Sequence, residues 1–172
     1  MKQSKPNPTL RKYCSRDWDS FVALDLETGL AGMSQASPAK KKVFAARWPK
    51  FLKSTYKWSA SGPTTNASAL YVIEDGAGEY AGHLWLTEQV DFFTGTKTLF
   101  VTTVAIAAKF RGRGWGLYLM KKAEKEARAR GLNSVGLGVD AGNIQACKLY
   151  AKLGFRTTRL AMVKSIRRDS RA

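Results

Sequence analysis

A glycine-rich segment in the second half of the chain has the residue types needed to hold a phosphate group. It contains, in order, Arg111, Gly112, Arg113, Gly114, Trp115 and Gly116. The apolar run before it predicts a strand and the run after it a helix, so free backbone N–H groups would lie at the positive end of a helix dipole. Glycine also permits positive φ and close approach of the backbone to a ligand. The segment therefore predicts a phosphate or pyrophosphate site in preference to a plain flexible turn.

Two other nucleotide-binding motifs fit this segment less well. A dinucleotide-binding motif has the spacing G-x-G-x-x-G directly after a strand, with an acidic residue about 20 positions later. Asp140 does follow the next expected strand, but the spacing here is G-x-G-x-G and begins several residues after the strand. A P-loop is excluded because no Gly-Lys-Ser/Thr follows the glycines.

The period of the apolar residues predicts the elements around this segment. We expect helices over about 17–26, 39–56, 115–130 and 143–153, and strands over about 10–13, 69–74, 80–88, 99–107, 134–139 and 157–164. Glycines at Gly29 and Gly32 are interpreted as the end of the first helical pattern. The three middle strands are separated by short turns, so they predict an antiparallel meander.

Length and composition are consistent with one domain. The 172 residues, of which 44% are apolar, predict a single domain over 1–172, with a flexible tail at 1–9 and a basic tail at 166–172. No apolar run is long enough for a membrane span and the N-terminus lacks the apolar centre of a signal peptide, so we expect a cytoplasmic protein. With two cysteines and one histidine, neither a disulfide framework nor a metal site is expected.

The chain is strongly basic, with 29 Lys and Arg against 13 Asp and Glu and a formal net charge of +16. Such a charge attracts anions, including a nucleotide cofactor, nucleic acid, a ribosome or an acidic substrate surface. Because the basic residues are spread along the chain, a solvated surface and specific nucleic-acid binding stand as equal alternatives.

Together with a second motif, the glycine-rich segment resembles the GCN5-related N-acetyltransferase (GNAT) superfamily. The family's cofactor signature is Arg/Gln-x-x-Gly-x-Gly/Ala after a strand, and Arg111, Gly114 and Gly116 occupy those places. The segment from Asn143 to Phe155 resembles the family's Asn-x-x-Ala-x-x-x-Tyr-x-x-x-Gly-Phe. The resemblance is close over about 69–164 and only topological before that. It implies an α/β (α+β) fold with a mixed, mostly antiparallel central sheet of six to seven strands and about four flanking helices.

The resemblance also implies an activity and a binding mode. The protein would transfer an acetyl group from acetyl-CoA to a primary amine by direct attack of the amine. In the family, a bulged strand pairs its exposed backbone with the pantetheine arm, and those positions map to Val104, Ala105 and Ile106. The pyrophosphate would lie on the N–H groups of 111–116, in a slot opened where this strand parts from 134–139. The Ile106 N–H would polarise the thioester carbonyl.

Acid–base roles follow from the same resemblance. Tyr150 matches the family's tyrosine and is the candidate acid that protonates the leaving thiolate, although a place in the core is the alternative. Asn143 is implied as a contact of the pantetheine arm, as a helix N-cap, or as both. The family's glutamate is missing, since residues 99–103 contain no carboxylate. The candidate bases are Glu88, Asp91, His83 or a water molecule.

The acceptor is a small molecule, a peptide or a protein, and the net charge favours anionic or ribosome-associated acceptors over strongly cationic ones. The resemblance implies an acceptor pocket between the first two helices and the loop at about 87–98. Candidate lining residues are Trp48, Trp58, Trp85, Phe92 and Phe93. A second hypothesis is a non-catalytic acyl-CoA-binding protein whose basic surface binds nucleic acid or the ribosome. A monomer and a homodimer are both open, and no membrane partner is expected.

Overall fold

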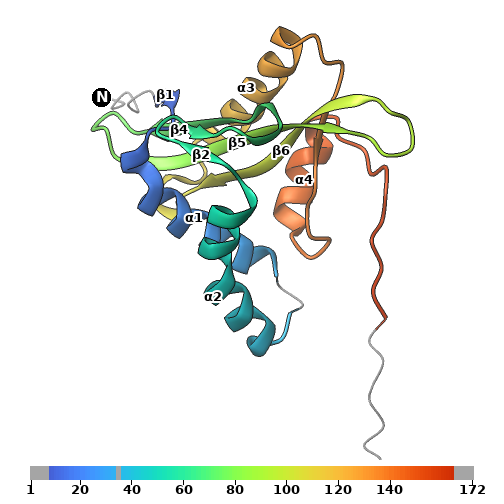
Figure 1. The fold of residues 1–172 in the computed structure, drawn as a ribbon, viewed down its shortest axis with the longest axis horizontal. Helices are drawn as coiled ribbons and strands as arrows, with labels where there is room; N and C mark the ends of the chain where they lie inside the picture. Colours follow the sequence, from blue (N-terminus) through green and yellow to red (C-terminus); the bar gives the residue numbers. More distant parts are fainter. Residues whose placement is uncertain (1–7, 34–35, 165–172) are drawn as a thin grey trace, which may run out of the picture.

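The computed structural model describes residues 8–33 and 36–164, whose strands form one central sheet and one small ribbon (Figure 1). The sheet contains β1 (Thr9–Lys12), β4 (Ala69–Glu74), β5 (Tyr80–Val90), β6 (Lys97–Ile106) and β7 (Val135–Leu137), and the ribbon pairs β2 (Trp58–Ser59) with β3 (Gly62–Pro63). The strand order is β1-β4-β5-β6-β7, in which β7 is parallel to β6 and the other neighbours are antiparallel. The expected mixed, mostly antiparallel sheet is confirmed.

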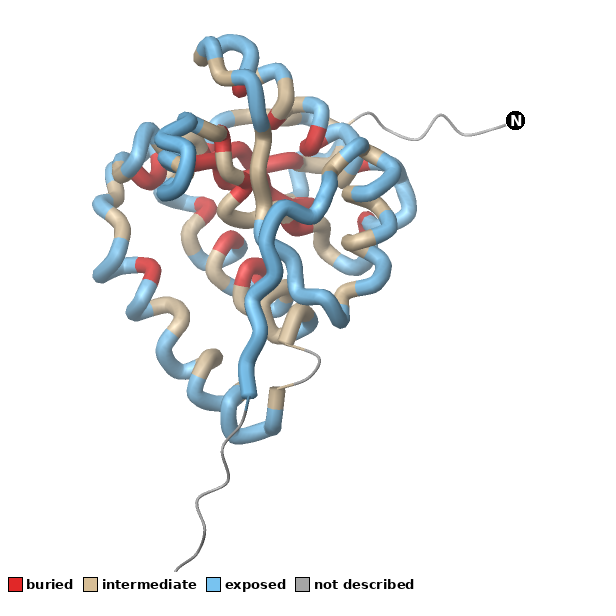
Figure 2. The backbone as a smooth tube through the Cα atoms, turned by 90° about the vertical axis from the view of Figure 1, so that its right-hand side faces the viewer, coloured by how far each residue is buried: buried red, intermediate tan, exposed pale blue. Residues whose placement is uncertain are grey.

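Helices lie on both sides of this sheet. The described residues form α1 (Trp18–Gly32), α2 (Pro38–Thr55), α3 (Trp115–Ala129) and α4 (Ile144–Lys152), with short 3₁₀ turns at Ser15–Asp17, Thr65–Ala67 and Ala108–Phe110. In Figure 1, α1 and α2 lie on one side of the sheet and α3 lies on the other. The buried residues gather on the strands between these layers (Figure 2).

Helix α3 packs on the sheet through a stripe of small and apolar residues. Leu119, Ala123 and Ala127 are buried in one hydrophobic cluster with Leu84 of β5 and Leu99 of β6. The two alanines carry little side-chain volume, so the helix backbone can approach the strands closely. This packing fixes the N-terminus of α3 at the end of β6, where the glycine-rich segment lies.

The opposite face of the sheet has an aromatic core. Phe21 of α1, Leu52 of α2 and Trp85 of β5 are fully buried. The Trp85 ring centroid lies 6.0 Å from that of Phe21 and 5.6 Å from that of Trp58. Trp58 and Trp85, both candidates for an acceptor site, therefore belong to the core that holds α1 and α2 on the sheet.

Helix α1 is longer than expected, because Gly29 does not end it. The helix continues to Gly32. A Cβ atom on Gly29 would lie 2.6 Å from Cζ of Phe44 in α2, which is closer than atoms can approach. The glycine therefore allows α1 and α2 to pack closely, and its role is in helix packing where the sequence suggested a helix end.

The central sheet has five strands among the described residues, where six to seven were expected. The expected last strand at 157–164 is unpaired, and Leu160, Met162 and Val163 are each at least 80% exposed. Figure 2 shows this segment as exposed along its length. The residues at 157–164 have the pattern of a strand, but a strand also requires a partner for its backbone, and none of the described residues pairs with this segment.

The N-terminal boundary also differs from the expectation. Thr9 is the first residue of β1 and pairs with Glu74, so the expected tail at 1–9 overlaps the sheet. The basic tail expected at 166–172 lies outside the described residues.

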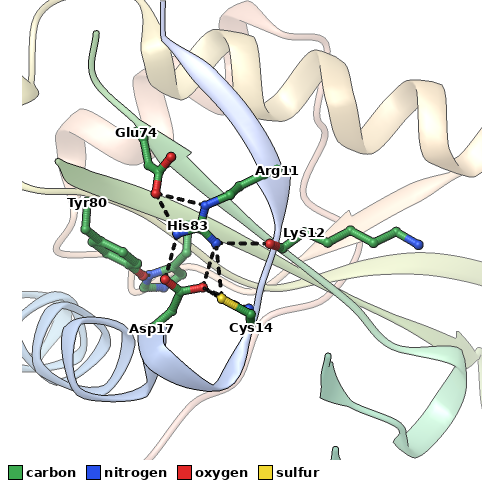
Figure 3. A network of polar contacts seen from close by, with 7 residues as sticks. All are labelled: Arg11, Lys12, Cys14, Asp17, Glu74, Tyr80 and His83. Atoms are coloured by element: carbon green, nitrogen blue, oxygen red, sulfur yellow. Dashed lines mark hydrogen bonds and ion pairs between the residues drawn. The ribbon is translucent and has the colours of Figure 1, made fainter. Parts of the chain in front are cut away.

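Arg11 of β1 links three elements through ion pairs (Figure 3). Its two terminal nitrogens each lie 2.7 Å from an oxygen of Asp17, and its Nε lies 2.8 Å from Oε1 of Glu74. Burial alone would raise the pKa of Asp17, but hydrogen bonds from Arg11 and from the Cys14 amide hold this pKa below its ordinary value. The arrangement fastens β1 to the turn that precedes α1.

Replacing Arg11 with methionine should therefore lower the free energy of unfolding by about 3 kcal/mol, because two carboxylates lose their partner. Urea denaturation at neutral pH measures this difference, and Lys12→Met, at an exposed neighbour, is the control. Because the folded-state pKa of Asp17 is depressed, the stabilisation is present above about pH 4 and is lost as the pH falls through that pKa. A gap between wild type and R11M that does not shrink in acid would contradict this assignment.

Candidate active site

A cavity of about 710 Å³ opens between the end of β6, the start of α3 and α4. The predicted site residues that line it are Val104, Ala105, Ile106, Arg111, Gly112, Gly114, Trp115, Gly116, Asn143 and Tyr150. The structure thus brings together all the predicted cofactor and catalytic residues except Arg113. The volume of this cavity is within the range of small-molecule sites.

The cavity exists because β6 and β7 separate. The two strands pair only from Leu99 with Val135 to Val101 with Leu137. At the same point β6 is irregular, since Trp85 of β5 is paired with Thr103 and the next residue of β5 with Val101, leaving Thr102 as the extra residue. The parting of the strands and the bulge in β6 that the resemblance implied are both observed.

The exposed edge of β6 presents backbone groups to the cavity. The N–H of Ala107 donates to the carbonyl of Ala81, which follows the antiparallel pattern between β5 and β6. Because N–H groups alternate in direction along a strand, the N–H of Ile106 points to the opposite side, away from β5. The Ile106 carbonyl points the same way and accepts a hydrogen bond of 2.9 Å from Nε of Arg111.

The glycine-rich loop forms the end of the cavity at the N-terminus of α3. Gly112 and Gly114 have φ values of 75° and 82°, the left-handed region that glycine adopts at little cost. Gly114 is the N-cap of α3 and provides no side-chain cap. A Cβ atom at Gly112 or Gly114 would meet no atom within 4 Å. First-turn N–H groups of a helix have no partner within the helix, so they are free here to donate to an anion.

The side chains of the two loop arginines lie in different places. Arg111 lines the cavity, and besides its bond to the Ile106 carbonyl it lies 3.2 Å from Glu27 of α1. Arg113 does not line the cavity, and its guanidinium stacks 5.2 Å from the Phe110 ring centroid and 5.5 Å from that of Trp115. The expected contact of Arg113 with the cofactor is therefore not supported for its side chain.

The helix α4 contributes Asn143 and Tyr150. The Asn143 side chain is the N-cap of α4 and accepts a hydrogen bond of 3.2 Å from the Ala146 N–H. Burial raises the pKa of Tyr150, and nearby Cys147 adds to the shift, so the phenol stays protonated at neutral pH. The Tyr150 ring also packs edge-on against Phe155, at 5.7 Å between centroids. Its position is thus compatible with both catalysis and packing.

A second cavity, of about 370 Å³, adjoins the first. Both are lined by Thr28, Val104, Asn143, Ala146 and Tyr150. The second cavity extends between α1, α2 and the ends of β6 and β7. Tyr150 therefore lies where two chambers meet, as a group that serves a donor on one side and an acceptor on the other would.

The candidate bases from the sequence lie elsewhere. Glu88 forms an ion pair of 3.2 Å with Arg130 at the end of α3, and Asp91 pairs with Arg159 at the turn between β5 and β6. Neither residue lines either cavity. His83 is fully buried and does not itself line the second cavity, although it contacts Asp25 and Thr103, which do. None of the three candidate bases is therefore exposed in either cavity.

Asp25 of α1 is a site residue that the sequence analysis missed. It lines the second cavity and is only 4% exposed. Its Oδ2 accepts a hydrogen bond of 2.7 Å from Nε1 of Trp48, and its Oδ1 lies 3.4 Å from Nε2 of His83. A signal was present, because Asp25 lies one helical turn after Phe21 and so places a carboxylate on the buried face of α1.

Of the five aromatic residues expected to line the acceptor pocket, one lines the second cavity. Trp48 lines the second cavity, together with Phe44, which was not predicted. Phe92 and Phe93 are 89% and 75% exposed at the tip between β5 and β6, and the loop at 87–98 contributes nothing to this cavity. The hairpin that carries this loop extends away from α1 and α2 (Figure 1).

The described residues contain neither a membrane-spanning helix nor a cluster of metal-binding side chains. None of the helices in 8–33 and 36–164 is long and apolar enough to cross a membrane. Within the same ranges, no group of three or more His, Cys, Asp and Glu side chains is arranged to hold a metal ion.

Comparisons with known proteins agree with this geometry. The profile of the Acetyltransferase (GNAT) family matches residues 38–155. The uncharacterized N-acetyltransferase YdgE of Bacillus subtilis is 28% identical over 141 residues, covering 78% of this chain and 88% of YdgE. A mycothiol acetyltransferase of Corynebacterium glutamicum is 30% identical over 149 residues, covering 81% of this chain but only 51% of that protein.

The fold is also that of solved acetyltransferase structures. A GCN5-related N-acetyltransferase from Ralstonia eutropha JMP134 superimposes with a TM-score of 0.69 at 18% identity, covering 93% of this chain and 99% of that structure. At this identity the likeness speaks for the fold alone, whereas the family profile spans the glycine-rich loop and α4. With the profile matched over most of the chain, this protein belongs to the Acetyltransferase (GNAT) family of acyltransferases.

Proposed function

We propose that this protein transfers an acetyl group from acetyl-CoA to a primary amine. The observation that carries the proposal is the convergence, on one cavity, of the α3 N-terminus, the free edge of β6 and Tyr150. The open space at Gly112 and Gly114 fits a diphosphate on the loop amides. The similarity to N-acetyltransferases supports the same reaction class.

Each part of the cavity would have its own role in binding or catalysis. The loop N–H groups from Gly112 to Gly116 bind the diphosphate, since the Arg111 N–H already donates to the Ala108 carbonyl at 3.2 Å, and the edge of β6 pairs with the amides of the pantetheine arm. When bound, acetyl-CoA supplies a thioester whose acyl carbon bonds to the amine nitrogen as the C–S bond breaks. The Ile106 N–H stabilises negative charge on the carbonyl oxygen. Tyr150 donates its proton to the departing sulfur, and the nitrogen loses its surplus proton to water or to a nearby base.

We further propose that residues 1–172 act as a single acetyltransferase domain. The matched family region covers the second helix to the end of α4, and α1 completes the wall of the second cavity. Without α1 the acceptor side of the site would be open.

Calorimetric titration with acetyl-CoA, followed by a thiol-release assay with a panel of primary amines, tests the proposal. We expect micromolar binding and amine-dependent release of coenzyme A above the rate of thioester hydrolysis. A folded protein that does not bind acetyl-CoA would overturn the proposal. Salt-sensitive binding of nucleic acid without turnover would instead favour the non-catalytic, basic-surface hypothesis.

A further inference from the structure

The second cavity is acidic, although the protein as a whole is strongly basic. Its lining contains the carboxylates of Asp25 and Asp140 and no lysine, arginine or histidine. The whole chain has a formal net charge of +16. The local charge of the cavity is thus opposite to that of the chain, and local charge decides what binds in a chamber of this size.

Asp25 is held ready to accept a further hydrogen bond. Its Oδ2 is bound by Nε1 of Trp48 at 2.7 Å, which fixes the carboxylate plane. Its Oδ1 takes no hydrogen bond from any described residue, since Nε2 of His83 bonds instead to Oγ1 of Thr103, at 2.7 Å. A carboxylate that is 4% exposed and has unused acceptor capacity calls for a cationic donor.

His83 is not a hydrogen-bond partner of Asp25, because both of its ring nitrogens are engaged elsewhere. Its Nδ1 lies 2.8 Å from the Tyr80 hydroxyl, and its Nε2 lies 2.7 Å from Oγ1 of Thr103. Oδ1 of Asp25, 3.4 Å from Nε2, therefore keeps a lone pair for a ligand in the cavity.

The wall beside Asp25 is aromatic. Phe44 and Trp48 both line the cavity, with ring centroids 5.0 Å apart. Gly29 and Gly32, on the same side, contribute no side chain to its lining. A carboxylate next to aromatic rings is a combination that binds an ammonium group together with an apolar stem.

We propose that the acetyl acceptor is a small cationic amine: a primary alkylammonium on an uncharged, apolar stem. Asp25 binds the ammonium group, and Phe44 and Trp48 pack on the stem, while the nitrogen faces the junction at Tyr150. This inference rests on the proposed acetyl transfer and names its substrate class. It reverses the expectation, drawn from net charge, that anionic or ribosome-associated acceptors fit best.

The first experiment uses the wild-type protein and two ligands of similar size. Phenethylamine is a primary alkylammonium with an aromatic stem, and phenylacetate is its anionic counterpart. With coenzyme A present to prevent turnover, calorimetry should detect phenethylamine and give a Kd for phenylacetate at least about 30-fold weaker. Equal binding of the two ligands, or preference for phenylacetate, would overturn the inference.

The second experiment removes the charge of Asp25. Asp25→Asn should raise the Kd and KM of phenethylamine about 30-fold or more and leave the Kd of acetyl-CoA unchanged, while Asp25→Glu should restore part of the affinity. Asp19→Asn makes the same charge change on the exposed face of α1 and should alter neither constant. An Asp25→Asn protein that folds and binds phenethylamine normally would refute the role of Asp25.

Two further readouts separate the possible failures. If acetyl-CoA binds but phenethylamine does not, the inference is wrong and the acetyl-transfer proposal stands; if acetyl-CoA does not bind, that proposal itself fails. The primary ammonium could also belong to a lysine side chain, so Nα-acetyl-lysine methylamide is assayed in parallel. A kcat/KM for this lysine compound above that of phenethylamine would overturn the assignment of a small free amine.

Discussion

Replacing Gly116 with glutamate should raise the Kd for acetyl-CoA by on the order of 100-fold, because it places a negative charge beside the proposed diphosphate site. Gly116 lies in the first turn of α3 and lines the larger cavity. It lacks the positive φ of Gly114, and a Cβ atom added to it would meet only Cδ2 of Leu149, at 4.0 Å. The substitution therefore adds charge without straining the backbone.

The loss of binding should not be accompanied by a loss of stability. An acidic side chain in the first turn of a helix interacts favourably with the helix dipole, by about 0.3–1 kcal/mol, and glutamate has a higher helix propensity than glycine. Thermal unfolding should therefore show no loss of stability in Gly116→Glu. If the binding defect came only from misfolding, the variant would unfold at a lower temperature than the wild type.

The matched control is Gly116→Gln, which has nearly the same size and no charge. We expect the glutamine variant to bind acetyl-CoA much more tightly than the glutamate variant, because only the latter repels the diphosphate. Calorimetry on the two proteins measures the difference. Equal losses in both would mean that side-chain volume dominates, and the assignment of an anion site to the α3 N-terminus would be contradicted.

Replacing Tyr150 with phenylalanine should lower kcat about 100-fold, since a positioned general acid typically contributes at least that much. Tyr150 lines both cavities, and no described residue hydrogen-bonds its hydroxyl, which leaves the proton available for a departing thiolate. Phenylalanine retains the ring that packs against Phe155. Steady-state kinetics with saturating acetyl-CoA should show the loss in kcat, and the Kd for acetyl-CoA should stay the same.

The pH dependence gives an independent check of the same role. Burial raises the pKa of Tyr150, so its phenol stays protonated up to and beyond the ordinary value of 10.0. Wild-type kcat should therefore show no decline that is due to Tyr150 until the pH exceeds that value. Tyr118→Phe, at a tyrosine that is 44% exposed on α3, is the control and should behave as wild type. Normal kcat in Tyr150→Phe would leave Tyr150 as a core residue only.

The order and type of the elements could be predicted because their signals are local. The change from a two-residue to a helical period at Gly112–Gly116 marked the glycine-rich loop, and the structure shows positive φ at two of its glycines. Strand patterns were less informative, because a strand forms only if a second strand pairs with it. The segment at 157–164 has the residues of a strand, but a strand forms only where another backbone pairs with it, and here it is unpaired.

The sequence by itself determined the family-type loop, the helix α4 with Asn143 and Tyr150, and a net charge of +16, since each depends only on residue types and their spacing. Only the tertiary structure decided the chemistry of the acceptor side. The packing of α1 and α2 on the sheet brings Asp25, Phe44 and Trp48 to one cavity beside Tyr150. Net charge is a sum over the whole chain, whereas the field inside a cavity depends on its nearest charges and on low local screening. A basic protein can for that reason contain an acidic site.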